Sequence, residues 1–297
     1  MNKKDPYFGA LEEKIDERDY QLCSGMLNLP EPSCTFDNER IEYEQNEVSN
    51  VSCTLHGALG ALSDNLGIRF SLEERKELWK RALELGAQEG FGWYVNQAVN
   101  LVRDFAREKG YDVLTFRVML GSEEFYEAIK LGYSVTTGYR GNGNYNRDIK
   151  ADAVLDGTDF GKTTYGHCLR MLKDQPKEMV DNYPQSRPNS NIYRIKIGNL
   201  PSLLKNGYFF TSGHVFVNRA DFQKENPIWS NATMWAVSSV KKAIKKKIAT
   251  KWNNPQKIIG DATAEQILIN LGALTQKLGN LSKERYIVAL DNLGLLE

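Results

Sequence analysis

No stretch of this sequence is both long and uninterruptedly apolar. A membrane-spanning helix needs roughly 18 or more consecutive apolar residues, and none of the apolar runs approaches that length. The first residues, MNKKDPYFGALEEKID, contain lysines but no apolar segment like that of a secretory signal peptide. We therefore expect a cytoplasmic protein with no signal peptide and no membrane partner.

The sequence is also poor in cysteine, and several metal and acid–base motifs are missing. Its 4 cysteines are too few for a disulfide scaffold in 297 residues, so we expect reduced thiols even though Cys23 and Cys34 could pair. The sequence contains no CxxC motif, no HExxH motif and no carboxylate pair suited to acid–base chemistry. Metal-dependent and two-carboxylate mechanisms therefore have no support, and we expect no cofactor.

Net charge is absent as well, because 38 lysines and arginines balance 38 aspartates and glutamates. No overall field therefore attracts nucleic acid or an anionic membrane. Lysines do cluster within residues 241–251, beside Trp235 and Trp252, and such a cluster could contact phosphates. We interpret it as the solvated face of a helix, because no nucleic-acid-binding motif accompanies it. A nucleic-acid partner is not expected.

The spacing of apolar residues changes along the chain and predicts an α+β fold. With 41% hydrophobic and 26% charged residues, the chain has the composition of a folded protein. Helical spacing dominates residues 52–110, whereas the β-branched and aromatic runs within residues 111–217 are typical of an antiparallel sheet or barrel. Helical spacing returns near the C-terminus. We expect one main domain, residues 1–228, and a C-terminal helical appendage, residues 229–297.

Cys53 is the candidate nucleophile. It follows Ser52, a predicted N-cap, at the start of a helix in which leucines recur at helical spacing. The peptide dipoles and unpaired N–H groups at a helix start favour a thiolate, which is the reactive form of cysteine. A cysteine at such a position is nevertheless often a buried small hydrophobe, so a catalytic role also requires a base.

The base must be one of 3 histidines. His167 follows a glycine at the start of an apolar strand, YGHCLRMLK, from which its ring could approach the helix start, and it is our candidate. His214, in SGHVFV, has a similar setting and is the alternative base. His56 lies inside the leucine-rich helix, where a packed core histidine is expected. Cys168 should point away from the site, because neighbours on a strand face opposite sides.

These segments resemble those of the papain-like cysteine peptidases. NEVSNVSCTLHGAL resembles that family's Ser-Cys motif at the start of an apolar helix, and YGHCLRMLK resembles its Gly-His strand. EEFYEAIKLGYSVTTGY looks like the helix and strand that precede the histidine, and KNGYFFTSGHVF looks like a Gly-Tyr strand near the domain's end. The resemblance covers about residues 8–225. It implies a helical half with Cys53, a sheet-rich half with His167, and a substrate cleft between them.

The resemblance also implies further site residues. The family orients its histidine with an asparagine in an Asn-Ser-Trp-Gly segment, which is absent here, and Asn199 is the candidate replacement. The family's oxyanion donor is a glutamine, whereas this chain has Glu47 at the matching position and Gln45 shortly before it. A carboxylate at that position would repel the developing oxyanion. The resemblance therefore predicts slow catalysis at neutral pH.

The function that the resemblance implies is thiol-dependent cleavage of an amide bond, with Cys53 as nucleophile and His167 as base. The substrate would be a peptide or protein, or the peptide cross-links of peptidoglycan. The substitution at Glu47 is also compatible with a different class of protein, a weakly active or inactive papain-like scaffold in a structural or adaptor role. Its C-terminal helices would then bind a protein partner. A phage-encoded member would be associated with the virion.

Overall fold

The computed structural model describes residues 10–11, 29–34, 43–141, 154–155, 165–171, 178–182, 194–197, 200–205, 209 and 211–225 of the chain. The chain divides into two compact units, one formed by Met1–Asp19 and Leu29–Ala220 and the other by Tyr20–Asn28 and Asp221–Glu297. Almost all of the described elements belong to the first unit. The predicted appendage, residues 229–297, lies outside the described residues, so the appendage and its boundary stay predictions.

Three helices pack together in the first half of the chain: α1 (Cys53–Leu66), α2 (Leu72–Glu84) and α3 (Val95–Glu108). Ser71 and Glu74 form the capping box that the sequence predicted at the start of α2, each side chain accepting from the backbone N–H of the other residue. Gly67 ends α1 with a φ of 70°, a left-handed conformation that favours glycine. Local sequence signals therefore set the start of α2 and the end of α1, whereas Ser52, the predicted N-cap of α1, makes no side-chain cap.

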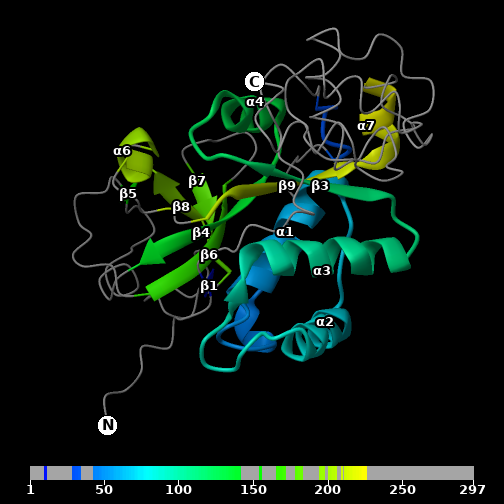
Figure 1. Cartoon of the computed structure of the whole chain (residues 1–297), viewed down its shortest axis with the longest axis vertical. Coiled ribbons are helices and arrows are strands. Elements are labelled where there is room, and N and C mark those ends of the chain that lie inside the picture. Colours follow the sequence, from blue (N-terminus) through cyan, green and yellow to red (C-terminus); the bar gives the residue numbers. More distant parts are fainter. Residues whose placement is uncertain are drawn as a thin grey trace, which may run out of the picture. The chain divides into compact units, whose positions relative to one another are not determined.

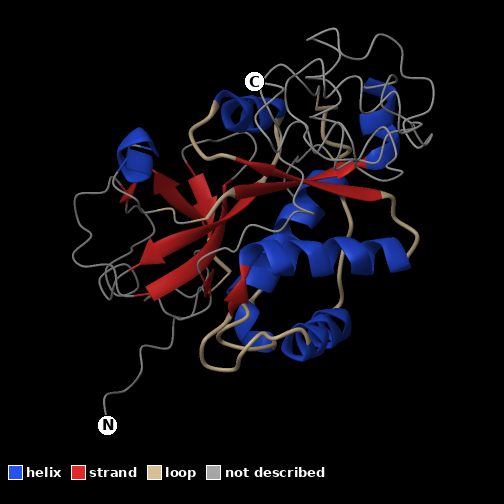
Figure 2. Cartoon of the chain, in the orientation of Figure 1, coloured by secondary structure: helices blue, strands red, loops and turns tan. Residues whose placement is uncertain are grey.

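A mainly antiparallel sheet forms the second part of the fold (Figure 2). In spatial order its strands are β3 (Val113–Val118), β9 (Gly213–Asn218), β4 (Val135–Gly141), β6 (Tyr165–Met171), β7 (Glu178–Val180), β8 (Arg194–Ile197) and β5 (Val154–Leu155). Only the last pair, β8 with β5, is parallel among these described strands. A separate short parallel pair joins β1 (Ala10–Leu11) to β2 (Trp93–Tyr94).

Helices lie on both sides of this sheet. Figure 1 shows α1 and α3 on one side of β3 and β9 and α4 (Glu123–Leu131) on the other. The remaining short helical segments are η1 (Gln45–Glu47), α6 (Leu200–Lys205) and α7 (Arg219–Glu225). Helix α1 is the central element, because every residue from Cys53 to Asn65 is buried and because α1 contacts both α3 and the sheet.

Two glycines of α1 allow it to pack closely on β6. A Cβ atom on Gly57 would lie 2.7 Å from the sulfur of Cys168, and one on Gly60 would collide with the guanidinium of Arg170. Cys168 and Arg170 therefore face α1, and residues that alternate with them on β6 face the opposite side of the sheet. The packing of α1 on β6 thus decides which strand residues lie near the start of α1.

The predicted α+β class is confirmed, since helices pack against an antiparallel sheet. The predicted alternative of a barrel is wrong, because the described strands form an open sheet with β3 and β5 at its edges. One further correction concerns β7, which lies in a proline-rich segment that its polar composition marked as a surface insertion. Among the residues that the structure describes, no helix has both the length and the apolar character needed to cross a membrane.

Candidate active site

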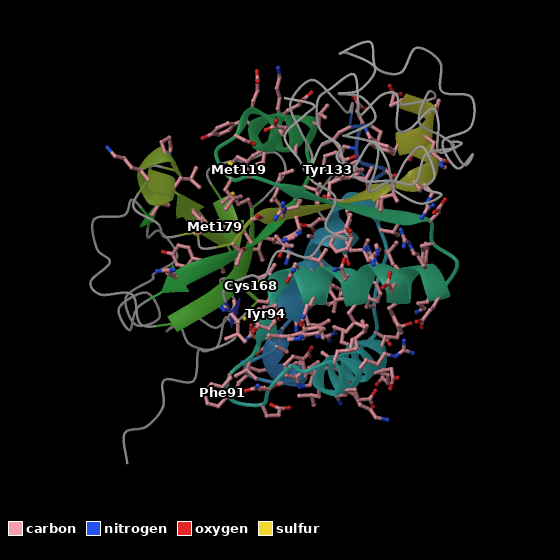
Figure 3. All side chains as sticks on the ribbon, viewed as in Figure 1. Phe91, Tyr94, Met119, Tyr133, Cys168 and Met179 are labelled. Atoms are coloured by element: carbon pink, nitrogen blue, oxygen red, sulfur yellow. The ribbon has the colours of Figure 1, made fainter. Side chains whose placement is uncertain are left out.

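Cys53 is the first residue of α1 and is completely buried. The backbone N–H of Cys168, on β6, hydrogen-bonds to its thiol. The sulfur of Cys168 also lies on the α1 side of the sheet, 3.3 Å from the hydroxyl of Thr136, and Figure 3 shows it between the sheet and the helices. The prediction that Cys168 points away from Cys53 is therefore wrong.

His167 pairs with a carboxylate that the sequence interpretation did not single out. Its Nε2 lies 2.8 Å from Oδ1 of Asp181, which follows β7, and both side chains are buried. An ionised carboxylate only accepts hydrogen bonds, so we assign the ring proton to Nε2, which leaves the lone pair on Nδ1. Asp181 therefore orients His167 and fixes the tautomer in which Nδ1 can act as a base.

The pKa of the Cys53 thiol is raised well above its ordinary value, first of all by burial. The neighbouring thiol of Cys168 and the carboxylate of Asp181 raise it further, while backbone hydrogen bonds from Cys168 and Thr54 lower it. Cys53 and His167, both of which the structure describes, form no hydrogen bond with each other. In the resting site the thiol is therefore neutral and is affected by the negative charge of Asp181. The Asp181 carboxylate itself pairs with His167 and not with the thiol.

Gln45 links the chain that precedes Cys53 to the residue after Asp181. Its backbone N–H donates to the carbonyl of Asn182 at 2.9 Å, and its side-chain Nε2 donates to the carbonyl of Asn50 at 2.8 Å. The side chain is buried, and its Oε1 has no partner among the described residues. The segment that leads into α1 thus holds the Gln45 amide. Asn50 accepts from only one of the two N–H groups on Nε2.

Glu47 forms an ion pair with the helical part of the fold. Its carboxylate pairs with Arg75 of α2, with 2.6 Å between Oε2 and Nη2, and its side chain is 46% exposed. The negative charge is therefore matched by a cation that belongs to the helical part of the fold. The assignment of Glu47 to the oxyanion position stays a prediction, and this ion pair argues against it.

His56 belongs to the core, as its place in the leucine-rich helix predicted. Its Nδ1 lies 3.0 Å from the carbonyl of Ser52, and its Nε2 lies 3.4 Å from Nη1 of Arg75. Because arginine only donates, Nε2 accepts and Nδ1 carries the proton. Burial lowers the pKa of His56 to about 3, the Arg75 charge adds to that effect, and the Ser52 carbonyl opposes it. This neutral ring has no role as the base.

The two remaining predicted residues are the alternative base His214 and the orienting candidate Asn199. His214 lies on β9, in register with Thr136 of β4 and Arg117 of β3, so β4 separates its strand from that of His167. Its role as an alternative base stays a prediction. Asn199 lies outside the described residues.

One signal for Asp181 was present in the sequence. The segment KEMVDNY follows the His167 strand and contains a short apolar pair just before an aspartate. That pattern is typical of a hairpin partner strand, here β7, which pairs Val180 with Arg170 of β6. The polar, proline-containing surroundings concealed it.

The structure therefore contains a cysteine at a helix start, a histidine with an orienting carboxylate, and a buried glutamine amide on the segment that leads into that helix. Each of these groups comes from a different element: α1, β6 with the end of β7, and η1. Comparison of the chain with models of known protein families and with curated proteins finds no match.

Proposed function

We propose that this protein is a papain-like cysteine hydrolase that cleaves amide bonds in peptides through Cys53 and His167. The observation that carries the proposal is the buried 2.8 Å pair between His167 Nε2 and Asp181 Oδ1, located where the Asp181 charge also acts on Cys53. A histidine held in this way by a carboxylate has one nitrogen fixed as donor and the other available for a thiol proton. Asp181 takes the role that the resemblance gave to Asn199.

In the first half of the reaction, Nδ1 of His167 accepts the proton of the Cys53 thiol, and the sulfur attacks the carbonyl carbon of the peptide. A C–S bond forms while the carbonyl π electrons move to oxygen. The backbone N–H of Cys53 and the second N–H of Gln45 Nε2 stabilise this oxyanion. The oxyanion then collapses, the C–N bond breaks, and the leaving amine takes the proton from His167.

In the second half, water attacks the thioester on Cys53 while His167 accepts its proton. The second tetrahedral oxyanion collapses with loss of the thiolate, which recovers the proton from His167, and the carboxylic acid product leaves. Asp181 remains ionised throughout and stabilises the imidazolium that forms in each half. The resting thiol is neutral and is not bonded to His167, and His167 alternates on β6 with Cys168, which faces α1. Substrate binding must therefore turn the imidazole toward the start of α1 and bring Nδ1 and the sulfur together, as catalytic hydrogen bonds often tighten only in the complex.

The complete burial of Cys53 favours a second candidate function, a catalytically silent papain-like scaffold with a structural or adaptor role. A buried thiol with a raised pKa is a poor nucleophile. In that case the His167–Asp181 pair would serve stability only.

Acylation by p-nitrophenyl acetate separates the two functions. In a Cys23→Ser, Cys34→Ser background, the hydrolase releases a burst of p-nitrophenolate at neutral pH, and mass spectrometry locates the acetyl group on Cys53. Cys53→Ala and His167→Ala abolish the burst, whereas Cys168→Ser, next to the histidine, retains it. A scaffold gives no burst, and its Cys53 becomes acetylated only under denaturing conditions. A quenched-fluorescent peptide library then tests peptide cleavage directly.

A further inference from the structure

The Arg75 guanidinium, from α2, connects two points on the segment that leads into Cys53 with one point in the first turn of α1. Its Nη2 lies 2.6 Å from the Glu47 carboxylate, and its Nη1 lies 3.2 Å from the carbonyl of Glu44 and 3.4 Å from Nε2 of His56. The Arg75 side chain is only 7% exposed, and it stacks over the ring of Tyr43, 5.1 Å from its centroid. One buried cation thus holds both ends of η1 and the first turns of α1.

Gln45 lies within the segment that Arg75 holds. The Gln45 carbonyl accepts from the backbone N–H groups of Val48 and Ser49, at 3.0 and 2.9 Å, which close the turn. The hydroxyl of Ser52, next to Cys53, also lies 3.4 Å from that carbonyl. Any rotation of η1 would therefore move the Gln45 amide relative to the start of α1.

Glu47 supplies the only side-chain attachment of η1 to α2 among the described contacts. The Glu44 attachment uses a backbone carbonyl, which any residue provides. The Glu47 carboxylate is half exposed, so truncating it leaves no cavity in the core, and Arg75 keeps the Glu44 carbonyl as an acceptor. The pair is therefore well suited to a selective test of what the position of η1 does.

We propose that Glu47 and Arg75 are positioning residues for acyl transfer, whose ion pair holds η1 so that the Gln45 amide faces the oxyanion formed at Cys53. The inference rests on the proposed function and deepens it. It gives Glu47 a role opposite to the one that the resemblance suggested. The carboxylate stabilises the geometry of the oxyanion donor, and it does not repel the oxyanion.

Two probes distinguish this role from a structural one. Acylation by p-nitrophenyl acetate builds an oxyanion on the substrate, whereas alkylation by iodoacetamide displaces iodide at carbon and builds none. Both reactions use the same Cys53 thiol and the same base. A misplaced Gln45 amide therefore slows acylation selectively, while a damaged fold or thiol slows both reactions.

We expect Glu47→Ala to lower the acylation rate by about 10- to 100-fold while the alkylation rate at the same pH changes by less than about twofold. Glu47→Gln should recover part of the loss, because its amide oxygen still accepts from Arg75. The matched control is Glu77→Gln, which breaks an exposed pair with Arg81 on the same helix α2. It should change neither rate.

Three outcomes would overturn the inference alone. They are an unchanged acylation rate in Glu47→Ala, an equal fall in both rates, and a rise in acylation in Glu47→Gln, which would return Glu47 to the oxyanion position. Wild-type protein that gives no acyl–Cys53 at all would instead overturn the proposed function, and this inference with it. Circular dichroism and thermal unfolding of each variant establish that it is folded before the rates are compared.

Discussion

The guanidinium of Arg170 donates through Nε to the carboxylate of Asp64, at 2.9 Å, and neither side chain is exposed to solvent. Ser134 donates to the same carboxylate oxygen at 2.6 Å. The Nη1 of Arg170 then reaches the side chain of Asn182 at 3.0 Å, and the carbonyl of Asn182 accepts from Gln45. A buried polar network therefore runs from the end of α1 through β6 to the residue beside Asp181.

The first prediction concerns this network. Asp64→Ala should lower the free energy of unfolding by about 3–5 kcal/mol, because it leaves the Arg170 charge buried without its partner. Chemical denaturation measures the change. The matched control is Asp104→Ala, which removes a half-exposed carboxylate paired with Arg103 and should cost less than about 1 kcal/mol. Similar losses in the two variants would show that the buried pair contributes no more than a surface pair.

Much of the fold could be predicted because its signals are local. Helix starts depend on residues within one turn, as the capping box of Ser71 and Glu74 shows. The strand at His167 was predicted from a glycine followed by apolar residues, and β6 begins there. Strand β7 was harder to predict, because its 3 residues carry only a short apolar pair within a polar, proline-containing segment and are fixed mainly by pairing with β6.

The site could be predicted only in part for a related reason. Alternation along a strand predicts that His167 and Cys168 face opposite sides, but it cannot say which of them faces α1. That choice depends on the fit of Cys168 against Gly57, a contact between distant parts of the chain. The partner of His167 is equally non-local, since Asp181 reaches it only because β7 pairs with β6. Glu47 was assigned by its distance from Cys53 along the chain, whereas Arg75 determines where its carboxylate lies.

The second prediction follows from the neutral His56. Its pKa is about 3 in the folded protein, against an ordinary value of 6.5 that we take for the unfolded chain. Between these two pKa values His56 is protonated in the unfolded chain but neutral in the folded protein. Its contribution to the free energy of unfolding is therefore fully present above pH 6.5 and is lost as the pH falls toward 3. Between pH 7 and pH 5 the loss should be about 2 kcal/mol. Denaturation at both pH values measures it.

A His56→Gln variant is the control for this pH dependence, because glutamine keeps hydrogen-bonding groups but does not titrate. Its stability should change less between pH 7 and pH 5 than that of the wild type. An equal change in both proteins would assign the effect to other groups.

The third prediction concerns the contact between α1 and β6. A Cβ atom on Gly57 would lie 2.7 Å from the sulfur of Cys168 and 3.0 Å from the hydroxyl of Thr136. Gly57→Ala should therefore cost about 1–3 kcal/mol of stability through overpacking. A Gly57→Ala, Cys168→Ala double variant removes the sulfur that the new methyl group would meet. Its loss of stability should be smaller than the sum of the losses in the two single variants by more than about 0.5 kcal/mol. Additive losses would mean that the two residues do not compete for the same space.

The last prediction uses the two separate effects of Asp181, which orients His167 and raises the pKa of Cys53. Asp181→Asn keeps an oxygen that accepts from Nε2 of His167 but removes the negative charge. The thiol should then ionise more readily, so alkylation of Cys53 by iodoacetamide should begin at a lower pH than in the wild type. The acylation burst should survive but become slower, because the imidazolium loses the charge that stabilises it. Asp181→Ala removes the charge and the hydrogen bond together. It should likewise lower the pH at which alkylation begins, but it should lower the acylation rate by at least about 100-fold, since the proton-accepting nitrogen of His167 is no longer fixed.

Equal acylation rates in the Asp181→Asn and Asp181→Ala variants would mean that the carboxylate does not orient the base. An unshifted alkylation profile in both would mean that its charge does not act on the thiol.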